Sequence, residues 1–165
     1  MSASELPVTS RDGLLVDTNL LVLWLIGETA IDAVGRTRRV REFDARAFGL
    51  VDAAVRRARE VVVTPHVLSE SSNLLGQVGG TRGLPASARR LLVESGRVWR
   101  ESHVRLREAM VDVGLVQAFG LTDWALLRLS RRYVLLTDDV GLVKASLRTG
   151  GRAINFRCYW IGGVL

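Results

Sequence analysis

Short apolar runs that alternate with helical patterns constrain the fold of this chain more than any other feature. Two such runs, Gly13–Asp17 and Tyr133–Asp139, end abruptly in acidic residues, and helical patterns follow them at Leu20–Ile26 and Leu142–Arg148. A continuous apolar run is typical of a strand that is buried on both faces, as strands are in parallel sheets. Because helices connect neighbouring parallel strands, the alternation predicts an α/β fold with a mainly parallel central sheet.

The remaining sequence predicts one domain built from the same two kinds of element. A chain of 165 residues has the size of a single domain. We expect residues 1–12 to form a flexible leader and residues 13–165 to form that domain. Along the chain, periodicity and capping residues first predict a basic loop and an amphipathic helix that ends near Glu60, followed by a strand at Val61–Val63 and a helix from Pro65 to Gly76. A helix at Ala86–Ser95 and a short strand at Val98–Trp99 come next, and then a helical stretch at His103–Phe119 with a break at Gly114. Gly120 opens another helix with Thr122 as its N-cap, and the last strand is expected at Arg152–Phe156.

Composition and charge narrow the class of protein. The apolar runs are too short to cross a membrane, and Cys158, as the only cysteine, excludes an internal disulfide and a cysteine-based zinc site. We therefore expect a cytoplasmic protein with no signal peptide and no membrane partner. The net charge of 23 − 17 = +6 and the pI near 10.8 favour polyanionic partners such as nucleic acid. Since Lys144 is the only lysine, a codon bias toward arginine is the alternative explanation.

Acidic residues occur at four separate places that the predicted fold would bring together. Asp17 and the pair Asp138–Asp139 follow strands whose carboxyl ends share one edge of the sheet. Glu70 borders an apolar helix stripe, and Asp123 leads the core-facing side of its helix. Like charges raise each other's pKa, and a cluster of this kind is usually retained to hold a cation. Oxygen ligands suit Mg²⁺ or Mn²⁺, so the sequence predicts a hard-metal site.

Each acid also has an ordinary structural explanation. Asp17 or Thr18 could simply cap the helix that follows, Glu70 could be a solvated surface residue, and Asp123 could favour the helix dipole. Asp123, however, occupies a position where the pattern calls for leucine. Such a departure from local patterning is typical of a functional site.

The acids and their neighbours, taken in order, resemble the PIN-domain nucleases. The resemblance implies a three-layer α/β/α sandwich and the hydrolysis of RNA phosphodiester bonds with Mg²⁺ or Mn²⁺. The matching segments are Leu15–Asn19, Thr64–Glu70, Gly120–Asp123 and Leu136–Asp139 with a late Asn155. The resemblance implies that the catalytic acids, which also hold the metal, are Asp17, Glu70, Asp123 and Asp139, with Asp138 as a further or alternative metal ligand, and that the site is oriented by Asn19 and Thr137.

The resemblance also implies partners. An RNA nuclease must bind phosphates, and each contact releases counterions from the strand. That contact would come from a basic cluster on an exposed loop, which consists of Arg36, Arg38, Arg39 and Arg41. An ordinary solvated surface is an equally favoured explanation of this cluster. Members of the family include toxins of type II toxin–antitoxin pairs, so an antitoxin protein and a homodimer are candidate partners. The Ile31–Glu60 segment is longer than in the small bacterial toxins.

Three other functions fit parts of the pattern. A haloacid-dehalogenase-type phosphatase also begins with a strand that ends in an acid, but it has a second Asp two places later, where this chain has Asn19. A non-catalytic PIN module would bind RNA or a protein only, and such a module should have lost acids that this chain keeps. A DNA-cutting enzyme of the flap-endonuclease-like branch would carry more acids and a helical arch.

Overall fold

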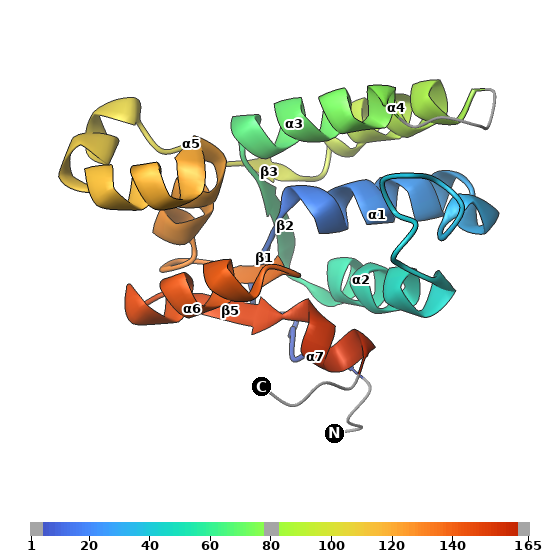
Figure 1. The fold of residues 1–165 in the computed structure, drawn as a ribbon. Helices are drawn as coiled ribbons and strands as arrows, with labels where there is room; N and C mark the ends of the chain where they lie inside the picture. Colours follow the sequence, from blue (N-terminus) through green and yellow to red (C-terminus); the bar gives the residue numbers. More distant parts are fainter. Residues whose placement is uncertain (1–4, 78–82, 162–165) are drawn as a thin grey trace.

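Five strands form one parallel sheet at the centre of the computed structural model, which describes residues 5–77 and 83–161 (Figure 1). The strand order is β3-β2-β1-β4-β5, and every neighbouring pair is parallel, so the predicted α/β fold with a parallel sheet is confirmed. The strands are β1 (Gly13–Val16), β2 (Glu60–Val63), β3 (Arg100–Glu101), β4 (Val134–Thr137) and β5 (Arg152–Asn155). The helices are α1 (Thr18–Thr29), α2 (Ala45–Arg57), α3 (Pro65–Gly76), α4 (Leu84–Ser95), α5 (Val113–Leu129), α6 (Val140–Arg148) and α7 (Phe156–Trp160), with short 3-10 helices η1 (Ile31–Ala33) and η2 (Leu106–Val111).

The order of the strands determines where a ligand can approach. From β1 the chain moves to β2 and β3 on one side, and it then returns to place β4 and β5 on the other side. The neighbours β1 and β4 therefore form a topological switch point, and open α/β sheets bind ligands beyond the carboxyl ends of the strands at such a point. Val16 pairs with Leu136, so the next residues, Asp17 and Thr137, emerge side by side there.

Helices flank the sheet on both sides. Figure 1 shows α1 to α4 gathered on one side, where α1 contacts α2, α3 and α4, and α5 beside α6 on the other side. Crossovers that all have the same hand produce this division, because the chain reverses its direction across the sheet between β3 and β4. None of the helices within residues 5–77 and 83–161 has the length and apolarity that a membrane crossing requires.

Helix α1 is enclosed by its neighbours along most of its length. Its residues from Leu20 to Gly27 are all buried, as expected for a helix that is apolar on every face. Helix α2 packs directly on Gly27, where an added Cβ would lie only 2.1 Å from a ring carbon of Phe48. Close packing therefore fixes the helix whose first turn follows Asp17.

Part of the segment expected to form a flexible leader packs against the domain. Residues 1–4 lie outside the described residues. Leu6 and Val8 are buried in the main core, and Glu5 forms an ion pair with Arg57 of α2. Two apolar residues separated by a proline form too short a pattern to indicate a packed segment, so the sequence carries little signal for this contact.

Two further segments differ from expectation. Strand β3 lies at Arg100–Glu101 and not at Val98–Trp99. The sequence did not indicate this position because both residues of the strand are exposed and give no apolar pattern. The helical stretch before Gly120 is interrupted at Asp112, between η2 and α5, and not at Gly114, whereas the break expected at Gly120 is confirmed. Gly120 adopts a φ of 81°, which glycine tolerates without strain. The helix expected after Gly120 is therefore the second half of α5, and the buried residues of α5 all lie in that half.

Candidate active site

Acidic side chains from four elements line one small cavity at the switch point. Its volume is about 170 Å³, which is below the range of roughly 300–1,000 Å³ that is usual for small-molecule pockets. The cavity is therefore sized for ions and small groups. The acids are Asp17 after β1, Glu70 on α3, Asp123 on α5 and Asp139 after β4, and the lining is completed by Thr18, Asn19, Thr137 and Leu142.

Two of these acids cap helices and line the cavity at the same time. Asp17 accepts a hydrogen bond from the Leu20 N–H through Oδ1 at 2.9 Å, and Asp139 accepts one from the Leu142 N–H through Oδ1 at 3.0 Å. The capping explanation of Asp17 is thus correct, but it does not exclude a functional one. Each cap uses one carboxylate oxygen and anchors its side chain at the positive end of a helix. The Oδ2 atom of Asp17 accepts a longer bond from the Asp138 N–H at 3.3 Å.

Glu70 is held in place by a residue that the sequence analysis considered only as a helix cap. Thr18 lies in the first turn of α1, and its hydroxyl donates a hydrogen bond to Glu70 Oε2 at 2.9 Å. This bond connects α1 to α3 across the cavity. A threonine directly after a strand-ending acid was the available signal, but its partner lies 52 residues further along the chain. Only the tertiary structure reveals such a distant contact.

Burial and the charges of neighbouring acids raise the pKa values of two of the four acids. Burial, together with the nearby charge of Asp138, raises the pKa of Asp17 from 3.8 to about 7, while a hydrogen bond from Thr137 opposes the shift. Burial, followed by the charges of Asp139 and Glu70, raises the pKa of Asp123 from 3.8 to about 6. The carboxylates therefore crowd one another without enough positive charge to balance them.

Asp138 and Asp139 have different environments, which separates the two residues that the sequence left as alternatives. Asp139 lines the cavity, and its N–H donates to the Thr137 hydroxyl at 3.0 Å. Asp138 is buried, accepts a hydrogen bond from Asn19 Nδ2 at 3.4 Å, and pairs with Arg157 at 3.3 Å. Asn19 and Thr137 thus each contact one of the paired acids. Sequence reasoning missed Arg157, whose partner is 19 residues away.

The predicted RNA-binding arginines do not line the cavity. All four are exposed, and Arg39 donates a hydrogen bond to Gln77, the residue directly after α3, at 2.7 Å. The next residue after Arg41, Glu42, pairs with Arg157 at 3.2 Å, and Arg157 also contacts Asp138. The basic segment is therefore tied at this end to the ion pair behind the cavity, while its arginines remain available to solvent.

The donors of the cavity fit a hard cation in their chemistry, although they are not drawn tightly together. Within residues 5–77 and 83–161, no group of three or more His, Cys, Asp or Glu side chains is arranged to hold a metal ion as it stands. The donors around the cavity are carboxylate oxygens, which Mg²⁺ and Mn²⁺ prefer. The raised pKa values of Asp17 and Asp123 show that a positive charge would relieve repulsion in this cavity.

The functional conclusion rests on the geometry of this cavity. No protein-family model matches the chain, and no curated protein matches it.

Proposed function

We propose that this protein is a divalent-metal-dependent endoribonuclease of the PIN type, with a three-layer α/β/α arrangement. The observation that carries the proposal is the convergence of four acids, each from a different element, on one cavity at the topological switch point. These are the acids that the resemblance to PIN-domain nucleases assigns to catalysis and metal binding: Asp17, Glu70, Asp123 and Asp139. The narrower idea of a type II toxin with an antitoxin partner stays a prediction.

The residues of the cavity would hold Mg²⁺ or Mn²⁺ through carboxylate oxygens. When bound, such an ion lowers the pKa of a water molecule and stabilises the charge that develops at the phosphorus during hydrolysis. Asp17, Asp123 and Asp139 would supply the main ligands, and Glu70 would supply a further oxygen. Glu70 and Asp139 are exposed, so their side chains have room to adjust toward an ion.

The neighbouring residues keep these acids in position. The Leu20 and Leu142 N–H groups fix one oxygen of Asp17 and one of Asp139, and the Thr18 hydroxyl fixes one oxygen of Glu70. Arg157 and Asn19 engage Asp138, so that this buried charge does not have to be neutralised inside the cavity. One oxygen of each of these three acids is thus held before a substrate arrives, as catalysis by positioned charges requires, while the other oxygen can adjust toward an ion.

The proposal is tested with end-labelled single-stranded RNAs of mixed sequence, incubated with Mg²⁺, with Mn²⁺ and with chelator alone. We expect internal cleavage with either metal and none in chelator, because the crowded carboxylates need the ion in order to act on a phosphate. A phosphomonoester is offered in parallel. If the RNAs stayed intact with both metals while the phosphomonoester was hydrolysed, the phosphatase alternative would replace the nuclease.

The basic segment gives a second prediction, which concerns RNA binding. Replacing Arg36, Arg38, Arg39 and Arg41 by alanine should weaken binding of a single-stranded RNA and flatten its dependence on salt. Each phosphate contact contributes about −0.7 to the slope of log K against log salt, so loss of four contacts would reduce the slope by up to about 3. A salt titration of RNA binding in chelator measures the change without cleavage.

The matched control removes four exposed arginines from other parts of the surface. Arg59, Arg131 and Arg132 lie close before strands at the opposite edge of the sheet, and Arg148 ends α6. Their replacement lowers the net charge by the same amount. Equal loss of slope in both variants would mean that RNA responds to overall charge and that the segment is ordinary solvated surface.

A further inference from the structure

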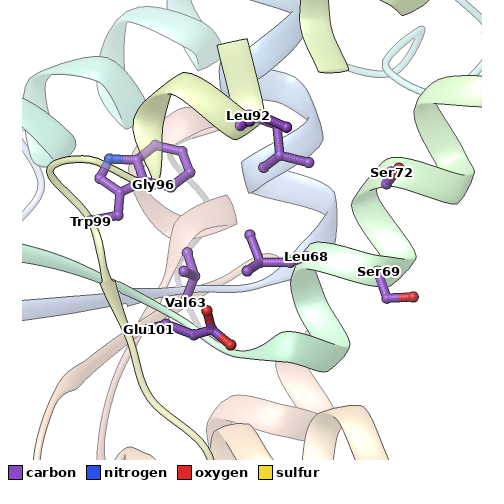
Figure 2. Close-up of a pocket in the computed structure, with 9 residues that line it drawn as sticks. Val63, Leu68, Ser69, Ser72, Leu92, Gly96, Trp99 and Glu101 are labelled. Atoms are coloured by element: carbon purple, nitrogen blue, oxygen red, sulfur yellow. The ribbon is translucent and has the colours of Figure 1, made fainter. Parts of the chain in front are cut away.

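A second and larger cavity lies on the same edge of the sheet, and the acidic site does not use it. Its volume is about 410 Å³, within the range of roughly 300–1,000 Å³ of small-molecule sites. Figure 2 shows Leu68 of α3 and Leu92 of α4 pointing into it, with Trp99 on the far side and Glu101 beside Val63. The walls are thus mainly apolar, with one aromatic ring and one carboxylate.

The two cavities are neighbours on the surface. Val63 and Glu101 are the last residues of β2 and β3 and pair with each other, so this cavity opens at the carboxyl edge that also carries the acids. Helix α3 separates the two cavities. Ser69 lines the larger cavity, and the next residue, Glu70, lines the acidic one. A helix is about 10 Å across, so a short stretch of one extended strand could occupy both cavities.

The larger cavity offers the two contacts by which proteins recognise an unstacked base. Trp99 is half-buried and is held by Trp24, with ring centroids 5.3 Å apart, so it presents a fixed aromatic surface. Glu101 is exposed and lines the cavity, and the neighbouring Arg100 pairs with Glu60 rather than with Glu101. Aromatic stacking together with hydrogen bonds to a base edge is the common mode of single-stranded RNA recognition.

We propose that this second cavity binds a guanine base of the RNA whose backbone enters the acidic cavity; this inference rests on the proposed nuclease function. An ionised carboxylate only accepts hydrogen bonds, through two oxygens. Guanine presents two adjacent donors, its N1–H and its 2-amino group, on its Watson–Crick edge. Adenine and cytosine place an acceptor next to their amino group, and uracil has acceptors on both sides of its N3–H. Glu101 therefore selects guanine.

Cleavage of matched strands tests the base preference. The substrates are uridine strands with one internal guanosine, and the same strands with adenosine or inosine, which lacks the 2-amino group. We expect the guanosine strand to be cut about tenfold faster or more, the size of effect that a paired hydrogen-bond contact gives. Glu101→Gln should reduce its rate to that of the adenosine strand. As a control, Glu94→Gln removes the charge of an exposed glutamate on α4 that does not line the cavity, and it should change neither rate.

A binding measurement separates failure of this inference from failure of the nuclease function. Guanosine monophosphate is titrated into the metal-free protein, and the indole N–H resonance of Trp99, assigned with Trp99→Phe, is followed by NMR. We expect a saturable shift that adenosine monophosphate does not produce and that Glu101→Gln abolishes. Such a shift without any RNA cleavage would leave the base site standing and overturn the nuclease. RNA cleavage without a guanosine preference, without the shift, or with a preference that Glu101→Gln leaves intact would overturn the base site alone.

Discussion

Asp123→Asn is expected to reduce RNA cleavage by at least about 100-fold while leaving the metal-free protein as stable as the wild type or more stable. The loss of activity follows from removing one charged metal ligand, since metal-bound charge contributes several kcal/mol to hydrolysis. The gain in stability follows from the raised pKa of Asp123, which reflects burial and repulsion by Asp139 and Glu70. A neutral amide removes that repulsion. Thermal melts in chelator at pH 7.5, paired with the RNA assay, measure both effects.

The same helix provides a matched control for this prediction. Asp112 lies just before α5 and accepts a hydrogen bond from the Trp124 indole at 3.1 Å, but it does not line the cavity. Asp112→Asn keeps an oxygen that can accept this bond but loses the ion pair with Arg128 at 3.5 Å, so it should lower stability by roughly 0.2–1 kcal/mol and leave cleavage unchanged. If Asp123 were only a structural acid at its helix, its substitution would behave as that of Asp112 does. A stable and fully active Asp123→Asn protein would remove Asp123 from the site.

The metal-free protein is also expected to lose stability as the pH rises from about 4 to about 7. The pKa of Asp17 is about 7 in the folded protein, against 3.8 for an ordinary Asp. Between these values the folded state keeps a proton that the unfolded state has released, so the free energy of unfolding falls as the pH rises. Asp123, with a pKa of about 6, contributes in the same direction. One unit of pKa shift corresponds to about 1.4 kcal/mol, so the total decrease should exceed about 1 kcal/mol.

Urea unfolding in chelator at several pH values measures this decrease. In Asp17→Asn the decrease should be smaller, because the largest contribution is gone while the amide oxygen can still cap α1. Acids with lowered pKa values, such as Asp12 and Asp44, act in the opposite direction, but only at lower pH. Saturating Mn²⁺ should remove most of the decrease, since a bound ion favours the ionised carboxylates. Stability that rises between pH 5 and pH 7 in chelator would contradict the crowded-acid description of the cavity.

The buried sheet could be predicted well from the sequence because its strands carry their own signal. Strands β1 and β4 are continuous apolar runs, and both are buried along their whole length. Strand β3 has two exposed residues and no apolar pattern, so its position depends on pairing with β2, which a local pattern cannot show. The packing of Leu6 and Val8 in the core was missed because two apolar residues form too short a local pattern.

The same distinction between local pattern and distant contact applies to the candidate site. The four acids could be proposed from the sequence because each one ends an apolar run, or borders or interrupts an apolar helix face, which is visible in the order of residues. Thr18 as the partner of Glu70 and Arg157 as the partner of Asp138 could not be predicted, since both contacts arise only when distant elements meet. The cavity beside Trp99 was missed as well, because its walls come from two strands and two helices.

The double role of Asp17 and Asp139 has a consequence for how such a protein can change during evolution. Each of them starts a helix as well as lining the cavity, so a lineage that no longer needs the chemistry still needs a capping side chain such as Asp, Asn or Ser at these two positions. Glu70 and Asp123 start no helix, and burial and repulsion disfavour the charge on Asp123. Drift after loss of activity would therefore erase Glu70 and Asp123 first. Descendants that keep only capping residues at positions 17 and 139 would look like binding modules while retaining the scaffold of the ancestral site.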